Sequence, residues 1–188
     1  MKVGLYLGSF NPFHNGHLDV VKQALNDFGM DIVVIVPTMK NPWKKEEPLP
    51  MDKRAGIIHA SLTSIQFMYP LAKDYLSLIY CPNNKCHLVK IDKIEESLIP
   101  PYYSYATLHA LKTKYCRHEV FVICGEDTIK DISDWMNGGE ILKDYNFLVS
   151  ERTDISSTDI RNKVKNKESI EGLVSSNILK RIEYLYGN

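Results

Sequence analysis

The chain begins with MKVGLYLGSFNPFHNGHLDVV (residues 1–21), and this stretch decides the fold. The apolar run Val3–Leu7 ends at Gly8, which predicts a buried strand followed by a tight turn. Apolar residues from Leu18 to Leu25 then recur at helical spacing, and Gly29 ends the pattern. The opening therefore predicts a strand, a turn and a helix.

The rest of the chain continues this alternation. Strands are predicted at Ile32–Val36, Leu88–Ile91, Val120–Cys124 and Phe147–Val149, and helices at Lys53–Leu62, Ser104–Lys114, before about residue 143, and near 157–165 and 176–186. Such alternation predicts an α/β fold: a Rossmann-like, doubly wound parallel sheet with C-terminal helices from about 155 to 188. We expect a single domain, 1–188. Residues 64–90 are the least readable part, where Tyr75–Tyr80 fits either a strand or a helix end.

The composition is that of an ordinary globular protein. The 188 residues carry 23 Lys+Arg and 23 Asp+Glu, so the net charge is zero, and we expect neither nucleic acid nor membrane as a partner. No apolar run approaches the roughly 20 residues needed to span a bilayer. Four cysteines are too few for a secreted disulfide scaffold, which favours free thiols in a reducing, cytoplasmic compartment. The oligomeric state stays open, and a homo-oligomer is compatible with these numbers.

The first motif that carries chemistry joins the first predicted strand to the first helix. Between Gly8 and His17 the chain offers a glycine turn, the start of a helix and two histidines three residues apart. Helix-start amides favour an anion, and two imidazoles beside them can donate hydrogen bonds to a polyphosphate. The candidate residues are Gly8, Ser9, Phe10, Asn11, His14, Gly16 and His17. The alternative is a structural turn with two surface histidines.

The second motif is ISSTDIR, residues 155–161. Ser156 followed three residues later by Asp159 resembles a capping box at a helix start. This helix follows the last predicted strand, so it lies on the same edge of the sheet as the first motif. Arg161 lies about one turn in, where its guanidinium can bind phosphate oxygens. The alternative is an ordinary capped surface helix.

Together the two motifs resemble the paired signatures of the nucleotidyltransferase superfamily of α/β phosphodiesterases. Within it, the chain resembles the nicotinate- or nicotinamide-mononucleotide adenylyltransferases. Three further segments are similar to that branch: Gly125-Glu126-Asp127 with the downstream Trp135, the segment Pro101–Leu108, and the closing helix Ile178–Tyr186. The resemblance spans nearly the whole chain.

The resemblance implies adenylyl transfer from ATP to the mononucleotide, giving a dinucleotide and pyrophosphate in NAD biosynthesis. It implies that His14, His17 and Arg161 hold the triphosphate, together with Mg²⁺ bound through the ATP phosphates and no metal site made by the protein. It further implies a pyridine pocket at Tyr103, Ser104 and Trp135, and nucleotide contacts from Lys44, Gly125, Asp127, Arg152, Ile155, Ser156, Ser157 and Thr158.

The chain departs from the branch's pattern at two places. Trp43 stands where the branch carries a histidine, so that histidine's role at phosphate either falls to Lys40, Lys44 or Lys45 or is lost. In the pyridine-pocket segment, Ser104 replaces threonine and Ala106 replaces aspartate, which leaves nicotinate versus nicotinamide open.

Other functions fit parts of the sequence less well. A pantetheine-phosphate adenylyltransferase shares both end motifs but not Gly125-x-Asp127 with Trp135, and an aminoacyl-tRNA synthetase fragment lacks its lysine-rich second signature. A non-catalytic dinucleotide sensor would be expected to lose the histidines and Arg161, which are present. A zinc site at Cys81, Cys86 and His87 fits no common spacing, and a clear fourth ligand is missing.

Overall fold

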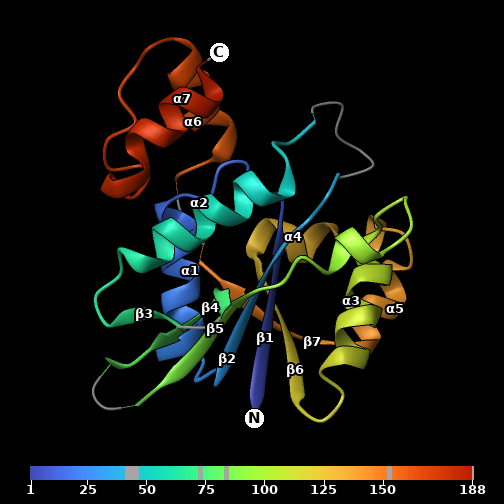
Figure 1. Ribbon diagram of the computed structural model, residues 1–188. Coiled ribbons are helices and arrows are strands. Elements are labelled where there is room, and N and C mark those ends of the chain that lie inside the picture. The colour runs from blue at the N-terminus through green and yellow to red at the C-terminus, as the bar shows by residue number, and fades with distance from the viewer. Residues whose placement is uncertain (41–46, 72–73, 83–84, 152–153, 188) are drawn as a thin grey trace.

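The computed structural model describes residues 1–40, 47–71, 74–82, 85–151 and 154–187 (Figure 1). The strands are β1 (Lys2–Gly8), β2 (Ile32–Pro37), β3 (Met68–Leu71), β4 (Asp74–Tyr80), β5 (His87–Ile91), β6 (Glu119–Gly125) and β7 (Asn146–Ser150). The α-helices are α1 (Asn15–Asn26), α2 (Met51–Thr63), α3 (Ser104–Lys114), α4 (Glu126–Asp131), α5 (Gly138–Asp144), α6 (Ser157–Lys165) and α7 (Leu179–Tyr186). Short 3-10 helices lie at Ile94–Ser97, Ile132–Asp134 and Ser176–Ile178.

Within the described residues, seven strands form one sheet in the order β3-β4-β5-β2-β1-β6-β7. The five strands from β5 to β7 in this order are parallel, which confirms the predicted α/β sheet. The edge formed by β3 and β4 departs from this parallel arrangement, because β4 runs antiparallel to both β3 and β5. This hairpin accounts for the unreadable stretch 64–90 and resolves Tyr75–Tyr80 as part of a strand.

Helices cover both faces of the sheet, as a doubly wound fold requires. Every residue of β2 is buried, because alternate side chains enter two cores. Val33 and Ile35 pack with apolar residues of α1 and α2, whereas Val34 and Val36 pack on the other face with residues of α3 and α5. This two-sided burial explains why β2 reads as an uninterrupted apolar run.

The C-terminal helices belong to the first of these faces. Ile160 of α6 and Ile182 of α7 are fully buried in the same core as α1 and α2. Figure 1 shows α6 and α7 beyond α1 and α2, at the edge where the parallel strands end. The predicted helices near 157–165 and 176–186 are therefore confirmed, and their packing brings α6 to the end of β1. Within the described residues, no helix is long and apolar enough to cross a bilayer.

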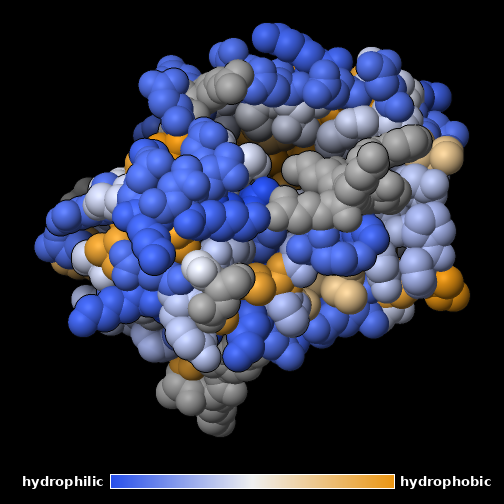
Figure 2. Space-filling model, turned by 90° about the horizontal axis from the view of Figure 1, so that it is seen from above, coloured by the Kyte–Doolittle hydropathy of each residue, from blue (hydrophilic) through white to orange (hydrophobic). Residues whose placement is uncertain are grey.

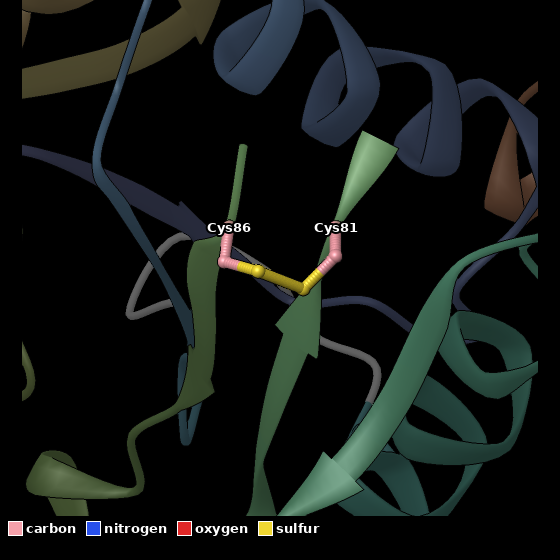
Figure 3. Close-up of a disulfide and its surroundings, with 2 residues drawn as sticks. All are labelled: Cys81 and Cys86. Carbon is pink, nitrogen blue, oxygen red and sulfur yellow. A yellow bond between two sulfur atoms is a disulfide. The ribbon is translucent and has the colours of Figure 1, made fainter. Parts of the chain in front are cut away.

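Two of the four cysteines form a disulfide, so the expectation of free thiols is wrong for them. Cys81 follows β4 and Cys86 precedes β5, and Figure 3 shows their sulfur atoms bonded. Tyr80 pairs with His87 in the antiparallel ladder, so the two cysteines come next to each other at the hairpin end. Counting cysteines could not reveal this pairing, which depends on the hairpin. Cys116 and Cys124 are free.

Candidate functional site

The loop after β1 is shaped by aromatic packing. A side-chain carbon at Gly8 would come within 2.9 Å of the Phe10 ring, so only glycine fits there. Phe10 itself has a left-handed backbone, with φ of 46°, and its ring is 2% exposed against Tyr6 and Phe13. The Phe10 side chain, predicted as a nucleotide contact, is therefore part of the support beneath the loop.

The two histidines of the first motif lie together at the start of α1. The His14 and His17 rings stack with centroids 3.6 Å apart. The backbone N–H of His14 donates to Nδ1 of His17 at 3.2 Å, so a neutral His17 ring carries its proton on Nε2. Phe10 and Phe13 pack on the same ring, with centroids 5.0 and 5.1 Å away. His17 is thus a fixed donor rather than a mobile surface side chain.

Both histidines are neutral at pH 7. Burial lowers the pKa of His14 from its ordinary 6.5 to about 4. Burial, and then the neighbouring His14, lower the pKa of His17 well below 6.5. The pair therefore offers hydrogen bonds without positive charge. Nδ1 of His14 is a buried nitrogen with no hydrogen-bond partner in the described structure, so this site holds an unused polar atom.

The second motif lies directly against the first. Ser156 caps α6 by accepting a hydrogen bond from the Asp159 backbone N–H at 3.1 Å, as the sequence predicts. Arg161 then donates from Nη1 to the Asn11 carbonyl oxygen at 2.8 Å, across 150 positions of sequence. The Ser157 hydroxyl donates to the Pro12 carbonyl oxygen, also at 2.8 Å. Two segments from opposite ends of the chain thus form one surface.

Fewer helix-start amides are available than the sequence suggests. The Asn15 N–H donates to the Leu173 carbonyl oxygen at 2.9 Å, and the His17 N–H donates to the His14 carbonyl oxygen. The side-chain amide of Asn15 likewise donates to the Gly172 carbonyl oxygen. The segment before α7 therefore occupies donors at the start of α1, and the side chains carry a larger share of any phosphate contact.

A buried polar framework, which the sequence analysis missed, fixes the loop from below. Arg54 of α2 is 1% exposed and donates to the carbonyl oxygens of Ser9 and Leu49, at 2.7 and 2.6 Å. The Asn11 side-chain oxygen accepts from the Leu49 N–H at 3.1 Å and from the Tyr186 hydroxyl at 2.7 Å. An arginine in an amphipathic helix is ordinarily exposed, so no sequence signal marks Arg54 as buried.

A cavity of about 300 Å³ lies on the other side of the end of β1. The predicted pyridine-pocket residues Tyr103, Ser104 and Trp135 all line it, and so do Gly8 and Ser9. Figure 2 looks down on this edge of the sheet and shows a hollow with an apolar floor among hydrophilic residues. Gly8 and Ser9 thus stand between the cavity and the histidine pair.

The remaining predicted residues are placed less centrally or are not described. Gly125 ends β6 and Asp127 is exposed in the first turn of α4, both outside the cavity lining. Ile155 packs against the core, and Thr158 accepts a long hydrogen bond of 3.4 Å from Arg161. The predictions for Trp43, Lys44, Lys45 and Arg152 lie outside the described residues.

The described residues contain no group of three or more His, Cys, Asp or Glu side chains arranged to hold a metal. The zinc alternative fails at its proposed ligands, because Cys81 and Cys86 are bonded to each other. What the edge of the sheet offers is a cavity with aromatic walls beside neutral imidazole donors and a guanidinium. Such an arrangement suits a ligand with a flat ring at one end and phosphates at the other.

Comparison with known proteins agrees with this geometry. Residues 5–181 match the family described as cytidylyltransferase-like. A probable nicotinate-nucleotide adenylyltransferase of Fusobacterium nucleatum is 34% identical over 99% of both chains, and one of Flavobacterium johnsoniae is 30% identical over 98% of this chain and 97% of that one.

A solved structure has the same fold. The Plasmodium falciparum nicotinic acid mononucleotide adenylyltransferase in complex with NaAD superposes with a TM-score of 0.71 at 15% identity, and 98% of each chain is covered. With the family match over residues 5–181 and relatives aligned end to end, the chain belongs to the cytidylyltransferase-like family of nucleotidyltransferases.

Proposed function

We propose that this enzyme transfers the adenylyl group of ATP to nicotinate mononucleotide and releases pyrophosphate. The observation that carries the proposal is the 2.8 Å hydrogen bond from Arg161 to the Asn11 carbonyl, which joins the two motifs beside the cavity. The names of the full-length relatives support the same reaction. The strand order supports this location of the substrate site, because such sheets bind ligands where the strand order reverses, here between β1 and β6.

The reaction needs no nucleophile from the protein. A phosphate oxygen of the mononucleotide attacks the α-phosphorus of ATP, a new P–O bond forms, and the bond from the α-phosphorus to the bridging oxygen breaks as pyrophosphate leaves. The attacking phosphate is already ionised at pH 7. Catalysis is then positioning and stabilisation of the charge that grows on the phosphate oxygens.

The side chains at the start of α1 and on α6 would supply that stabilisation. His17 would donate from Nε2, whose proton is fixed by the hydrogen bond at Nδ1. Arg161 would supply the positive charge that the neutral histidines lack, and His14 the second imidazole. The backbone amides of residues 156–158, with Asp127 and Gly125, would contact the nucleotide.

Mg²⁺ would be held by the triphosphate and by water rather than by a protein cage. The imidazoles of His14 and His17 and the guanidinium of Arg161 would contact the same phosphates. The ion would neutralise the negative charge of the phosphates.

The pyridine ring would enter the cavity lined by Trp135, Tyr103 and Ser104. Aromatic side chains at such a position bind a flat ring through stacking. This arrangement favours nicotinate mononucleotide over phosphopantetheine, whose flexible chain has no ring for Trp135 to stack on.

The direct test is a comparison of acceptors. ATP is incubated with nicotinate mononucleotide, nicotinamide mononucleotide or phosphopantetheine, and products are identified by mass and by pyrophosphate release. We expect a dinucleotide and pyrophosphate from a pyridine mononucleotide. Product from phosphopantetheine alone would establish the rival enzyme, and dinucleotide binding without turnover would establish a sensor.

The role of His17 is tested by the variant His17→Ala. Loss of one preorganised donor costs about 2.7–4 kcal/mol in other enzymes, so we expect kcat to fall by about two to three orders of magnitude. His109→Ala, on the exposed surface of α3, is the matched control and should retain full activity. A folded His17→Ala enzyme with near-normal kcat would remove His17 from the reaction.

A further inference from the structure

Among the described residues, the cavity beside Trp135 is lined by one positively charged side chain and no negatively charged one. The positive charge is that of Lys40. The Cys124 thiol in its wall stays protonated, because burial raises the pKa of that thiol to about 11. The other walls are aromatic, aliphatic or hydroxyl-bearing. A cavity of this kind favours an anionic ligand over a neutral ligand of the same shape.

The backbone that leads to Lys40 is firmly held. The Thr38 N–H donates to the Gly8 carbonyl oxygen at 2.9 Å. The Met39 N–H donates to one oxygen of Glu95 at 2.5 Å, and the other Glu95 oxygen accepts from the Thr107 hydroxyl at 2.6 Å. Glu95 is 1% exposed, so this anchor is shielded from water. The Lys40 side chain therefore starts from a fixed point on the cavity wall.

The ammonium group of Lys40 is available to a ligand. In the structure it pairs with Glu47, and the two side chains are 45% and 70% exposed. Exposed ion pairs of this kind contribute little net free energy. A carboxylate that enters the more enclosed cavity can therefore replace Glu47 as the partner of Lys40.

Given the adenylyl transfer proposed above, on which this inference rests, we propose that Lys40 sets the acceptor preference by binding the ring carboxylate of nicotinate mononucleotide. The nicotinamide analogue has almost the same shape and differs in that one substituent, a neutral carboxamide. A cation at the ring gains a charge-assisted hydrogen bond only from the carboxylate. A cation at a phosphate, by contrast, would serve both mononucleotides equally.

The test measures kcat/KM for both mononucleotides at saturating ATP. For Lys40→Gln we expect kcat/KM with nicotinate mononucleotide to fall about ten- to hundredfold, the value of a hydrogen bond to a charged group, through a raised KM. With nicotinamide mononucleotide we expect a change of about twofold or less, as for a substitution that touches no bound group. Lys40→Arg should restore much of the preference. Lys85→Gln, at the opposite end of the sheet, is the matched control and should leave kcat/KM unchanged for both mononucleotides.

Binding provides an independent readout. Quenching of the intrinsic tryptophan fluorescence by each mononucleotide, measured without ATP, should show the same selective loss in Lys40→Gln. Equal losses for both mononucleotides would place Lys40 at a phosphate and overturn the inference, as would no loss at all. Wild-type enzyme that makes no dinucleotide from either acceptor would instead refute the proposed function, so the two failures are distinguishable.

Discussion

The chemistry of His17 is decided by its surroundings more than by its residue type. An exposed histidine titrates near neutral pH and exchanges its proton between two nitrogens. Here burial and the stacked His14 ring keep His17 neutral, and the His14 N–H at its Nδ1 selects the tautomer. The positive charge of the site consequently falls to the guanidinium of Arg161.

The lowered histidine pKa values predict a loss of stability in mild acid. The unfolded chain protonates His14 near its ordinary pKa of 6.5, but the folded chain does so only near 4. As the pH falls from 7, the unfolded state therefore binds more protons, and the free energy of unfolding decreases. The linkage relation gives about 2 kcal/mol lost to His14 by pH 5, with a further loss from His17.

Urea unfolding at pH 7 and pH 5 measures this loss. His14→Gln removes one of the titrating rings, so its stability should change less between the two pH values than that of the wild type. His109→Gln, which removes an exposed imidazole, should keep the wild-type pH dependence. An identical pH dependence in His14→Gln and the wild type would contradict the buried, neutral state of His14.

At the scale of elements, the loop after β1 is held from several sides. Arg54 of α2 binds its Ser9 carbonyl, Arg161 of α6 binds its Asn11 carbonyl, and Tyr186 of α7 binds the Asn11 side chain. Each contact comes from a different helix, so the loop keeps its shape only when these helices are docked. This links the folding of the C-terminal helices to the readiness of the site.

Arg54→Met is predicted to weaken both stability and catalysis. The carbonyl oxygens of Ser9 and Leu49 would lose their buried donor, which costs about 1–3 kcal/mol. Because Ser9 precedes the histidine pair, we also expect a higher KM for ATP and a lower kcat. Thermal unfolding and steady-state kinetics measure the two effects. Arg54→Lys should keep part of the stability and part of the activity that Arg54→Met loses. Lys53→Met, at the exposed neighbouring position, is the control and should keep nearly wild-type stability and kinetics.

The sequence predicts the elements whose burial is regular and misses those that depend on partners. β2 and β6 are predicted because continuous apolar runs of that length suit a strand covered on both faces. β3 is missed because Met68–Leu71 is short, sits at the sheet edge and contains a proline. Buried Arg54 and Glu95 are missed for another reason: their hydrogen-bond partners are distant in sequence, and charged residues are usually exposed.

At the scale of the molecule, the site is a consequence of strand order. β1 is followed by α1 on one face, whereas β5 is followed by α3 on the other face before β6. The connections that follow β1 and β5 therefore lie on opposite faces of the sheet. As a result, the histidines lie on one side of the carboxyl end of β1 and the Trp135 cavity lies on the other. For this reason the sequence predicts that the motif after β1 and the motif at residues 155–161 meet, although no local sequence pattern gives the distance between them.

The opposite end of the sheet holds the Cys81–Cys86 disulfide, and its distance from the site leads to a final prediction. The bond closes a short loop between β4 and β5, at the amino end of β5, whereas the site lies at the carboxyl ends of the parallel strands. Closure of a loop this short lowers the entropy of the unfolded chain by an amount worth about 2 kcal/mol. Reduction should therefore lower the thermal midpoint and leave kcat and KM unchanged.

Thermal unfolding and kinetics with and without dithiothreitol test this separation. The double variant Cys81→Ser/Cys86→Ser should match the reduced wild type and no longer respond to the reductant. Cys116→Ser, at the exposed free cysteine, should respond as the wild type does. A change in kcat on reduction, absent from the double variant, would mean that the hairpin is coupled to the loop after β1.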